Sequence, residues 1–190
     1  MKTDIILSGV GGQGILSIAT IIGEAAMKEN LHIKQSEVHG MSQRGGDVQS
    51  NLRISSEKIN SDLIELGQAD VIISMEPMEA LRYLPYLSKN GWIITSDKPY
   101  VNITNYPDIE KIKADLNKVE NVIMLDIETL AKENEVARSA NVILLGAAQK
   151  ALNLEYSKLE DAIRRVFGRK GDEVVNANIK ALAIGKAAQK

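Results

Sequence analysis

The sequence predicts an α/β protein whose mainly parallel sheet is covered by helices on both faces. Short apolar runs rich in β-branched residues alternate with helical segments along the first two thirds of the chain. The last third, from Glu128 onward, has a helical pattern throughout, so we expect it to pack around the sheet. The 190 residues are 44% hydrophobic and 25% charged, which suits one sizeable core and predicts a single domain over residues 1–190.

The expected strands are apolar runs bounded by turn residues, at 4–7, 31–35, 48–54, 70–75, 91–96 and 121–126. The second and third alternate apolar and polar residues, as half-exposed strands do, and this pattern suggests that the third is antiparallel or at an edge of the sheet. The expected helices lie at 15–30, 76–87, 107–118, 128–134, 139–152, 158–167 and 172–188. The segment 141–148 is apolar nearly all round, which favours burial on several sides over contact with a partner. The order of elements predicts a three-layer, Rossmann-like α/β/α domain with a helical C-terminal third.

A glycine-rich turn joins the first strand to the first helix. It reads Gly9-Val10-Gly11-Gly12-Gln13-Gly14, a spacing found in many nucleotide-binding proteins. Gly9 and Gly11 permit backbone angles and close approaches that a side chain would block, and Gly14 is expected to let the helix lie against the sheet. The N–H groups and the positive end of the helix dipole suit a phosphate or another anion. An anion site and a role in tight packing both remain open from this motif.

The polar, glycine-punctuated stretch 36–47 is predicted to be a long loop with a function. In it, the Arg44 guanidinium is placed to clamp a carboxylate or phosphate, with a salt bridge that ties down the loop as the alternative. Neighbouring polar groups would orient a ligand or satisfy the backbone. The candidate binding residues of this stretch are Ser42, Gln43, Arg44, Gly45 and Gly46.

Two further residues of this stretch bear on a nicotinamide cofactor. A dinucleotide-binding protein places an acidic residue about 20 positions beyond its glycines, and Glu37 lies at roughly that distance from Gly14. The unusual segment that follows weakens this interpretation. His39 is expected to be a structural anchor, because no second catalytic residue is paired with it. We predict no catalytic residue and no metal site in this chain by itself.

Composition excludes several functions. The formal net charge is −2, so the overall charge recruits neither nucleic acid nor an anionic membrane surface. There is no cysteine, which excludes disulfides, a thiolate nucleophile and thiolate ligation of an iron–sulfur cluster by this chain. The sequence has no apolar signal core and no run long enough to cross a bilayer, and a cytoplasmic location is the expectation.

Two motifs together resemble one family. The turn 9–14 and the run His39-Gly40-Met41-Ser42-Gln43-Arg44-Gly45-Gly46 are similar to the gamma-type subunit or domain of 2-oxoacid:ferredoxin oxidoreductases. The second motif looks most like the beta subunit of the indolepyruvate branch. The resemblance extends over the whole chain, including Phe167-Gly168-Arg169-Lys170-Gly171. The cofactor-binding candidates on these motifs are Gly9, Gly11, Gly12, Gln13, Gly14, Ser42, Gln43, Arg44, Gly45 and Gly46.

The resemblance implies an activity that belongs to a complex. An arylpyruvate such as indolepyruvate, coenzyme A and oxidised ferredoxin would give the aryl-acetyl-coenzyme A, carbon dioxide and reduced ferredoxin. It implies that thiamine diphosphate and iron–sulfur clusters reside chiefly on a larger partner subunit, that this chain binds neither firmly, and that the isolated chain is inactive. The missing cysteines agree with that division.

Two alternatives remain at this level. One is a free-standing Rossmann-type oxidoreductase that uses a nicotinamide cofactor, and the other is a regulatory module that binds coenzyme A or a nucleotide. The sequence leaves open which 2-oxoacid is used and whether the isolated chain forms a homodimer.

Overall fold

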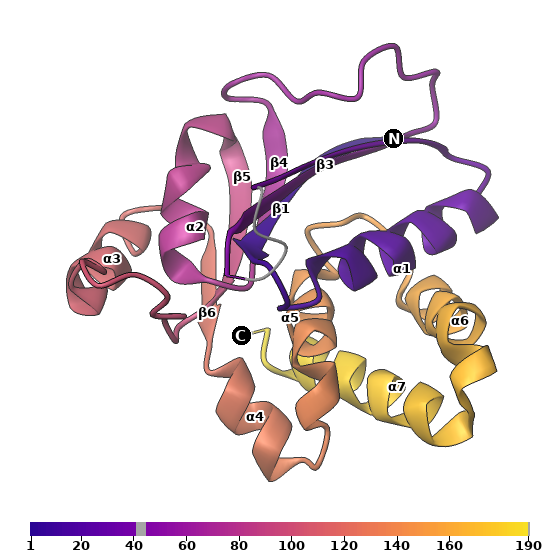
Figure 1. The fold of residues 1–190 in the computed structure, drawn as a ribbon. Helices are drawn as coiled ribbons and strands as arrows, with labels where there is room; N and C mark the ends of the chain where they lie inside the picture. Colours follow the sequence, from indigo (N-terminus) through magenta and orange to yellow (C-terminus); the bar gives the residue numbers. More distant parts are fainter. Residues whose placement is uncertain (41–44, 190) are drawn as a thin grey trace.

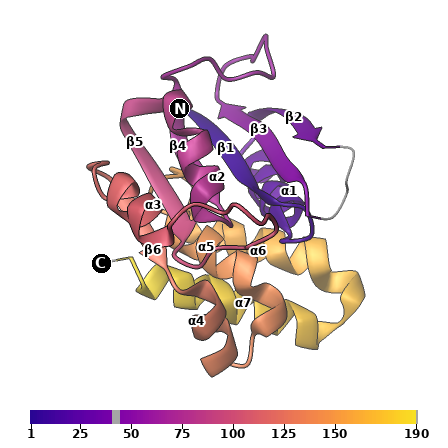
Figure 2. The same cartoon turned by 60° about the vertical axis from the view of Figure 1, so that its left-hand side comes forward.

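The structure is a computed structural model that describes residues 1–40 and 45–189. In this part of the chain six strands form one sheet, in the order β2-β3-β1-β4-β5-β6 (Figures 1 and 2). The strands are β1 (Lys2–Val10), β2 (His32–His39), β3 (Asp47–Ser55), β4 (Ala69–Ser74), β5 (Leu87–Ser96) and β6 (Val122–Leu125). Strands β1, β4, β5 and β6 run parallel to one another, whereas β3 is antiparallel to both β1 and β2. The prediction of a mainly parallel sheet is confirmed.

Helices cover both faces of the sheet. They are α1 (Ile15–Lys28), α2 (Pro77–Arg82), α3 (Ile109–Leu116), α4 (Ile127–Glu133), α5 (Ala140–Ala148), α6 (Tyr156–Phe167) and α7 (Asp172–Ala187). Short 3₁₀ turns lie at Leu84–Tyr86, Ala137–Ser139 and Gly168–Lys170. Helices α2 and α3 lie on one side of the sheet, and α1, α5, α6 and α7 lie on the other (Figures 1 and 2). The three predicted layers are therefore present. Among the helices of the described residues, none is long and apolar enough to cross a membrane.

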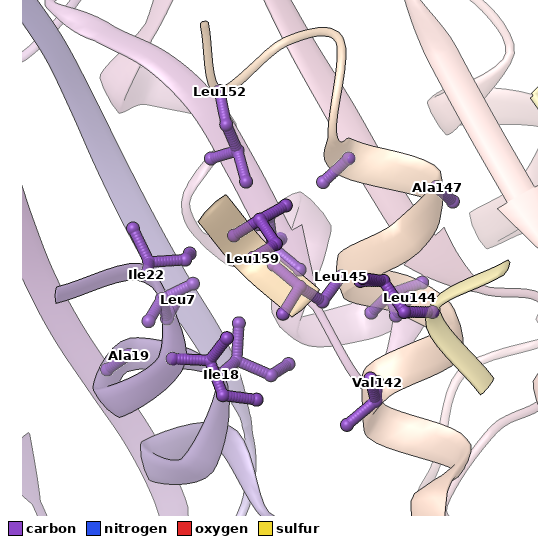
Figure 3. Packing of buried hydrophobic residues seen from close by; sticks show 14 of the residues in the cluster. Leu7, Ile18, Ala19, Ile22, Val142, Leu144, Leu145, Ala147, Leu152 and Leu159 are labelled. Atoms are coloured by element: carbon purple, nitrogen blue, oxygen red, sulfur yellow. The ribbon is translucent and has the colours of Figure 1, made fainter. Parts of the chain in front are cut away.

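The larger core lies between the sheet and the α1, α5, α6 layer. Figure 3 shows side chains of β1, α1, α5 and α6 meeting there, among them Leu7, Ile18, Leu145 and Leu159. Residues Val142 to Ala148 of α5 are all buried, which confirms the interpretation of that apolar segment as core. A smaller core on the other face joins alternate residues of the central strands to α2 and α3.

Helices α5 and α7 touch through their backbones. A Cβ atom on Gly185 of α7 would overlap the carbonyl oxygen of Ile143 and lie 2.7 Å from its carbonyl carbon. A Cβ atom on Gly146 of α5 would likewise overlap the carbonyl oxygen of Leu182. Glycine is therefore required at both positions, because any side chain would push the helices apart.

Several predicted boundaries are wrong; β5, for example, begins at Leu87 and not at residue 91. Two others concern the ends of β2 and α2. The stretch 36–39, predicted as loop, continues β2, because it pairs with β3 in a register that runs from Ser36 opposite Asn51 to His39 opposite Val48. The helix predicted at 76–87 ends at Arg82 and gives way to a 3₁₀ turn that contains Pro85. Proline cannot continue the helical hydrogen bonds, and the chain then enters β5.

Candidate functional site at the glycine turn

The glycine turn leaves the carboxyl end of β1 and enters α1. Gly9, with φ of 155°, is packed so closely that a Cβ atom there would lie 2.5 Å from Ile15 Cδ1 and 3.1 Å from Met75 Cβ. Gly12 and Gly14 have φ of 105° and 82°, which side chains disfavour. Gly14 is the N-cap of α1, and the first turn of this helix has no side-chain cap and no acidic residue. The positive end of α1 is therefore not neutralised by the helix's own first turn.

Gln13 fixes the turn to the next strand. Its Oε1 accepts a hydrogen bond from the N–H of Val10 at 2.7 Å, and its Nε2 donates to the carbonyl oxygen of Met75 at 3.3 Å. Met75 directly follows β4, the parallel neighbour of β1. One side chain thus closes the turn and ties it to the place where β4 ends.

The two sequence motifs meet in space. The N–H of Gly11 donates to the carbonyl oxygen of Gly46 at 2.8 Å, and the N–H of Gly45 donates to the carbonyl oxygen of Gly11 at 3.2 Å. The Asn102 amide also donates to the carbonyl oxygen of Gly45 at 2.5 Å. Gly45 and Gly46 therefore lie against the turn. The other three candidates of this motif, Ser42, Gln43 and Arg44, lie outside the described residues.

The expected role of Gly14 in helix–sheet packing is wrong. A Cβ atom on Gly14 would meet the side chain of Asn141, 2.9 Å from its Nδ2, and not the sheet. Asn141 is on α5, and its Nδ2 donates to the carbonyl oxygen of Gly14 at 3.0 Å. Gly14 thus allows α5 to hold the start of α1, and Gly9 provides the close packing beneath the turn.

A cavity of about 390 Å³ lies on the β2 side of the turn. Its walls are Gly11, Gly12 and the start of α1 on one side and Glu37 and His39 of β2 and Val48 of β3 on the other. Glu37 accepts a hydrogen bond from the Gln35 amide at 2.9 Å. His39 is an exposed strand residue whose Nδ1 lies 3.2 Å from the carbonyl oxygen of Gly40. Both residues are therefore part of the wall beside the turn.

A second cavity, of about 440 Å³, lies on the other side of the turn. Gly12 lines both cavities, so the turn forms the ridge between them. This second cavity lies at the carboxyl ends of β1, β4 and β5, where helices switch from one face of the sheet to the other. Open α/β sheets bind their ligands at such a point. Lys98 and Arg138 supply positive charge there and Glu128 supplies negative charge, and Lys98 forms an ion pair with Asp126 at 3.2 Å. Its hydrogen bond to Asp126 raises the pKa of Lys98.

A buried carboxylate holds the loop that borders this cavity. Glu76 is fully buried and accepts hydrogen bonds from the N–H of Glu79 at 2.9 Å, the N–H of Tyr100 at 3.4 Å and the hydroxyl of Tyr106. Burial, and then the bond to Glu76, raise the pKa of Tyr106. The carboxylate therefore anchors both ends of the segment 100–106 over α2, with Asn102 between them.

Glu79 is a second buried carboxyl group in α2, and it predicts a pH dependence of stability. Burial raises its pKa above the ordinary value of 4.5, although Arg82 at 2.8 Å opposes the shift. A raised folded pKa stabilises the fold below about pH 4.5, and this contribution is lost as the pH rises through the folded pKa. We expect Glu79→Gln to gain stability relative to the wild type between about pH 4 and pH 7 in urea unfolding.

The matched control for this experiment is Glu110→Gln. Glu110 forms an exposed ion pair with Lys113, at 3.5 Å, on α3. The difference in free energy of unfolding between this variant and the wild type should change little over the same pH range. If the difference in free energy of unfolding between Glu79→Gln and the wild type stayed the same from about pH 4 to pH 7, the expected cost of the buried charge would be contradicted.

The sheet order argues against a dinucleotide site. In a Rossmann fold the second strand lies beside the first, so its acidic residue faces the ribose next to the glycine turn. Here the antiparallel strand β3 lies between β1 and β2. Glu37 is therefore one strand farther from the turn than a ribose-binding carboxylate would be.

Sequence reasoning missed four polar residues of the site: Lys98, Asn102, Arg138 and Asn141. Lys98 carried a usable signal, because it follows the end of a predicted parallel strand, where α/β proteins bind ligands. The other three come from distant loops and from α5, and only the tertiary fold brings them to the turn. Among the described residues, no three His, Asp or Glu side chains are grouped closely enough to hold a metal ion.

The fold and the paired motifs define a Rossmann-like α/β subunit with a glycine turn at the sheet's switch point. Residues 4–188 match the family described as Pyruvate ferredoxin/flavodoxin oxidoreductase, and the chain belongs to that family. It is 36% identical to the Indolepyruvate oxidoreductase subunit IorB of Pyrococcus horikoshii, over 98% of this chain and 96% of that protein.

Two solved structures are similar to the whole chain. The gamma subunit of a keto/oxoacid ferredoxin oxidoreductase from Geobacter sulfurreducens is 25% identical, with a TM-score of 0.67 and 98% of each chain covered. The 2-oxoglutarate:ferredoxin oxidoreductase from Magnetococcus marinus is 25% identical, with a TM-score of 0.77; the match covers 99% of this chain and 31% of that chain. The gamma-type resemblance predicted from the two motifs is confirmed.

Proposed function

We propose that this chain is the small subunit of a 2-oxoacid:ferredoxin oxidoreductase of the indolepyruvate type. The complex would convert an arylpyruvate and coenzyme A to the aryl-acetyl-coenzyme A and carbon dioxide, with reduction of ferredoxin. The observation that carries the proposal is the match over residues 4–188, together with the 36% identity to a protein named as an indolepyruvate oxidoreductase subunit. In this proposal residues 1–190 act as one domain.

The glycine turn would be one rim of a cleft that a larger subunit completes. Backbone hydrogen bonds join Gly11 to Gly45 and Gly46, so both motifs face one location. The start of α1 offers a positive dipole end without an acidic residue in its first turn, which suits the phosphates of coenzyme A. The proposed binding residues are Gly9, Gly11, Gly12, Gln13, Gly14, Gly45 and Gly46, with Ser42, Gln43 and Arg44 added on sequence grounds.

The redox and decarboxylation cofactors would be held by the larger subunit. This chain has no cysteine and so offers no thiolate to an iron–sulfur cluster. In this proposal the chain itself holds no cofactor firmly. The chain's own contribution is to bind and orient coenzyme A or the oxoacid. Ferredoxin contact through the complex, a cytoplasmic location and dimerisation of the isolated chain stay predictions.

The experiment is reconstitution with the larger subunit. Coenzyme A-dependent reduction of ferredoxin by that subunit should rise about tenfold or more when this chain is added, since positioning a reactant makes large contributions to rate. The variant Gly23→Ala, on α1 and away from the turn, is the control and should restore the same activity.

Two outcomes would contradict the proposal. No rise on adding the chain, although the subunits associate, would favour a regulatory module that binds coenzyme A or a nucleotide. Tight NAD(P)H binding by the isolated chain, with turnover of a small alcohol or oxoacid, would favour the nicotinamide-dependent alternative.

A further inference from the structure

Two adjoining cavities lie at the end of the sheet opposite the glycine turn. One, of about 450 Å³, lies at the amino ends of β1, β4 and β5 and is lined by Lys2, Lys89, Trp92 and Lys150, among others. The other, of about 240 Å³, shares Trp92, Lys150 and Ala151 with it. Because parallel strands carry their amino ends at one edge, this location is separate from the proposed coenzyme A site at their carboxyl ends.

The smaller cavity is an apolar slot beside an exposed indole. Trp92 is 37% exposed although its indole is the largest apolar side chain of the sequence, and it lies on β5 beside Ile123 of β6 and Ala147 of α5. The chain end after α7, which supplies Gln189 to this wall, lies beside β6 in both views (Figures 1 and 2). A planar ring placed against Trp92 would cover apolar surface on both partners and gain stacking energy.

The larger cavity carries excess positive charge. Lys89 and Lys150 are exposed and form no ion pair among the described residues. Lys2 lies 2.9 Å from Asp4, but the Arg53 guanidinium already binds that carboxylate through two hydrogen bonds of 2.8 and 3.1 Å. Three lysines thus line the cavity, and the ammonium group of Lys2 is shared with Asp4. The carboxylate in the lining is Asp70, which accepts a hydrogen bond from the N–H of Asp4 at 2.8 Å.

Gln189, which lines the apolar slot, carries a buried acceptor that finds no donor within the described part of the chain. The Nε2 atom of Gln189 donates to the carbonyl oxygens of Gly146 and Ala147 at 2.9 and 2.6 Å, which fixes the orientation of the amide. Its Oε1 atom is buried and has no hydrogen-bond partner among the described residues. A buried acceptor of this kind favours a ligand that brings an N–H group.

We propose that the two cavities form a binding site for an adenine nucleotide. The purine would stack on Trp92 and donate its exocyclic amino group to Gln189, and the phosphates would lie among Lys2, Lys89 and Lys150. The apolar slot, with the buried acceptor oxygen of Gln189, matches the base of a nucleotide. The lysines of the adjoining cavity match its phosphates. A free nucleotide and the nucleotide portion of coenzyme A share this chemistry.

The site can be tested on the unmodified chain, because Trp92 is its only tryptophan. ADP should quench the Trp92 fluorescence in a saturable way at low salt. Adenosine should need a much higher concentration to quench it, and so should inorganic phosphate to compete with ADP. Coenzyme A is titrated separately; tighter binding than ADP would assign the site to coenzyme A rather than to free nucleotides. In Lys89→Gln/Lys150→Gln the dissociation constant for ADP should rise about tenfold, since two partly screened charge contacts are lost.

The control is Lys28→Gln/Lys111→Gln, which removes the same charge from exposed positions on α1 and α3. It should leave the dissociation constant for ADP within about twofold, because neither lysine lines the two cavities and exposed charges are screened by salt. Unchanged Trp92 fluorescence at millimolar ADP and coenzyme A would overturn the proposal. Equal weakening in both double variants would also overturn it, because binding would then follow net charge and not this cavity.

Discussion

Gly185→Ala is expected to destabilise the protein by about 3 kcal/mol or more. The added Cβ atom would overlap the carbonyl oxygen of Ile143, and backbone atoms cannot turn aside as a flexible side chain can. Helix α7 would have to move away from α5, whose residues Val142 to Ala148 are buried against the core. Urea unfolding measures the loss.

Gly23→Ala provides the matched comparison. Gly23 lies inside α1, where an added Cβ atom would have no neighbour within 4 Å, so the same substitution should stabilise the protein by about 0.5–1 kcal/mol. The double variant Gly146→Ala/Gly185→Ala should lose less than the sum of its single variants, because helices already pushed apart leave room for the second methyl group. Equal effects of Gly185→Ala and Gly23→Ala would show that the α5–α7 contact is looser than described.

Gln13→Ala should lower both the stability of the chain and the activity of the assembled enzyme. The substitution leaves the buried N–H of Val10 without its acceptor, at a cost of about 1–3 kcal/mol. It also releases the turn from Met75, so that the N–H groups at the start of α1 lose their fixed position. A misplaced binding group costs on the order of tenfold to a hundredfold in rate, which a reconstituted assay with saturating partner subunit would detect.

Gln13→Glu separates the two contacts. A glutamate keeps an acceptor for the N–H of Val10 but loses the donor to the carbonyl oxygen of Met75. It should therefore fold better than Gln13→Ala and still lose activity, partly because its negative charge opposes an anion at the turn. The control is Gln68→Ala, at an exposed position, which should change neither quantity. Full activity of Gln13→Ala would exclude the turn from substrate or coenzyme A binding.

Local pattern predicted the parts of this protein that depend on local physics. The glycine turn was recognisable because a buried strand, glycines that allow positive φ and a helix follow one another within residues 4–22. The apolar segment of α5 predicted its own burial. The layers followed from alternation of strands and helices, since parallel strands need crossover helices.

The remaining features depend on partners far along the chain. The alternating pattern of β3 suggested an antiparallel or an edge strand, and β3 is antiparallel but lies inside the sheet. Its place between β1 and β2 could not be predicted, because the pattern does not name the neighbouring strands. The residues 36–39 resembled a loop because an edge strand needs few apolar side chains. Asn102 and Asn141 joined the site through hydrogen bonds to Gly45 and Gly14, and neither residue is near its partner in sequence.

Because β3 pairs with β1, the register of these two strands sets the distance between the two motifs. Nine residue pairs, from Lys2 opposite Ser55 to Val10 opposite Asp47, align β3 with β1 and so place Gly46 next to Gly11. A slip of one residue would move Gly46 by about 3.4 Å along β1 and turn every side chain of β3 to the opposite face. The hydrogen-bonded pairing of β1 and β3 thus fixes the spacing of the two motifs. A single-residue insertion within β3 would separate the motifs without changing a residue of either.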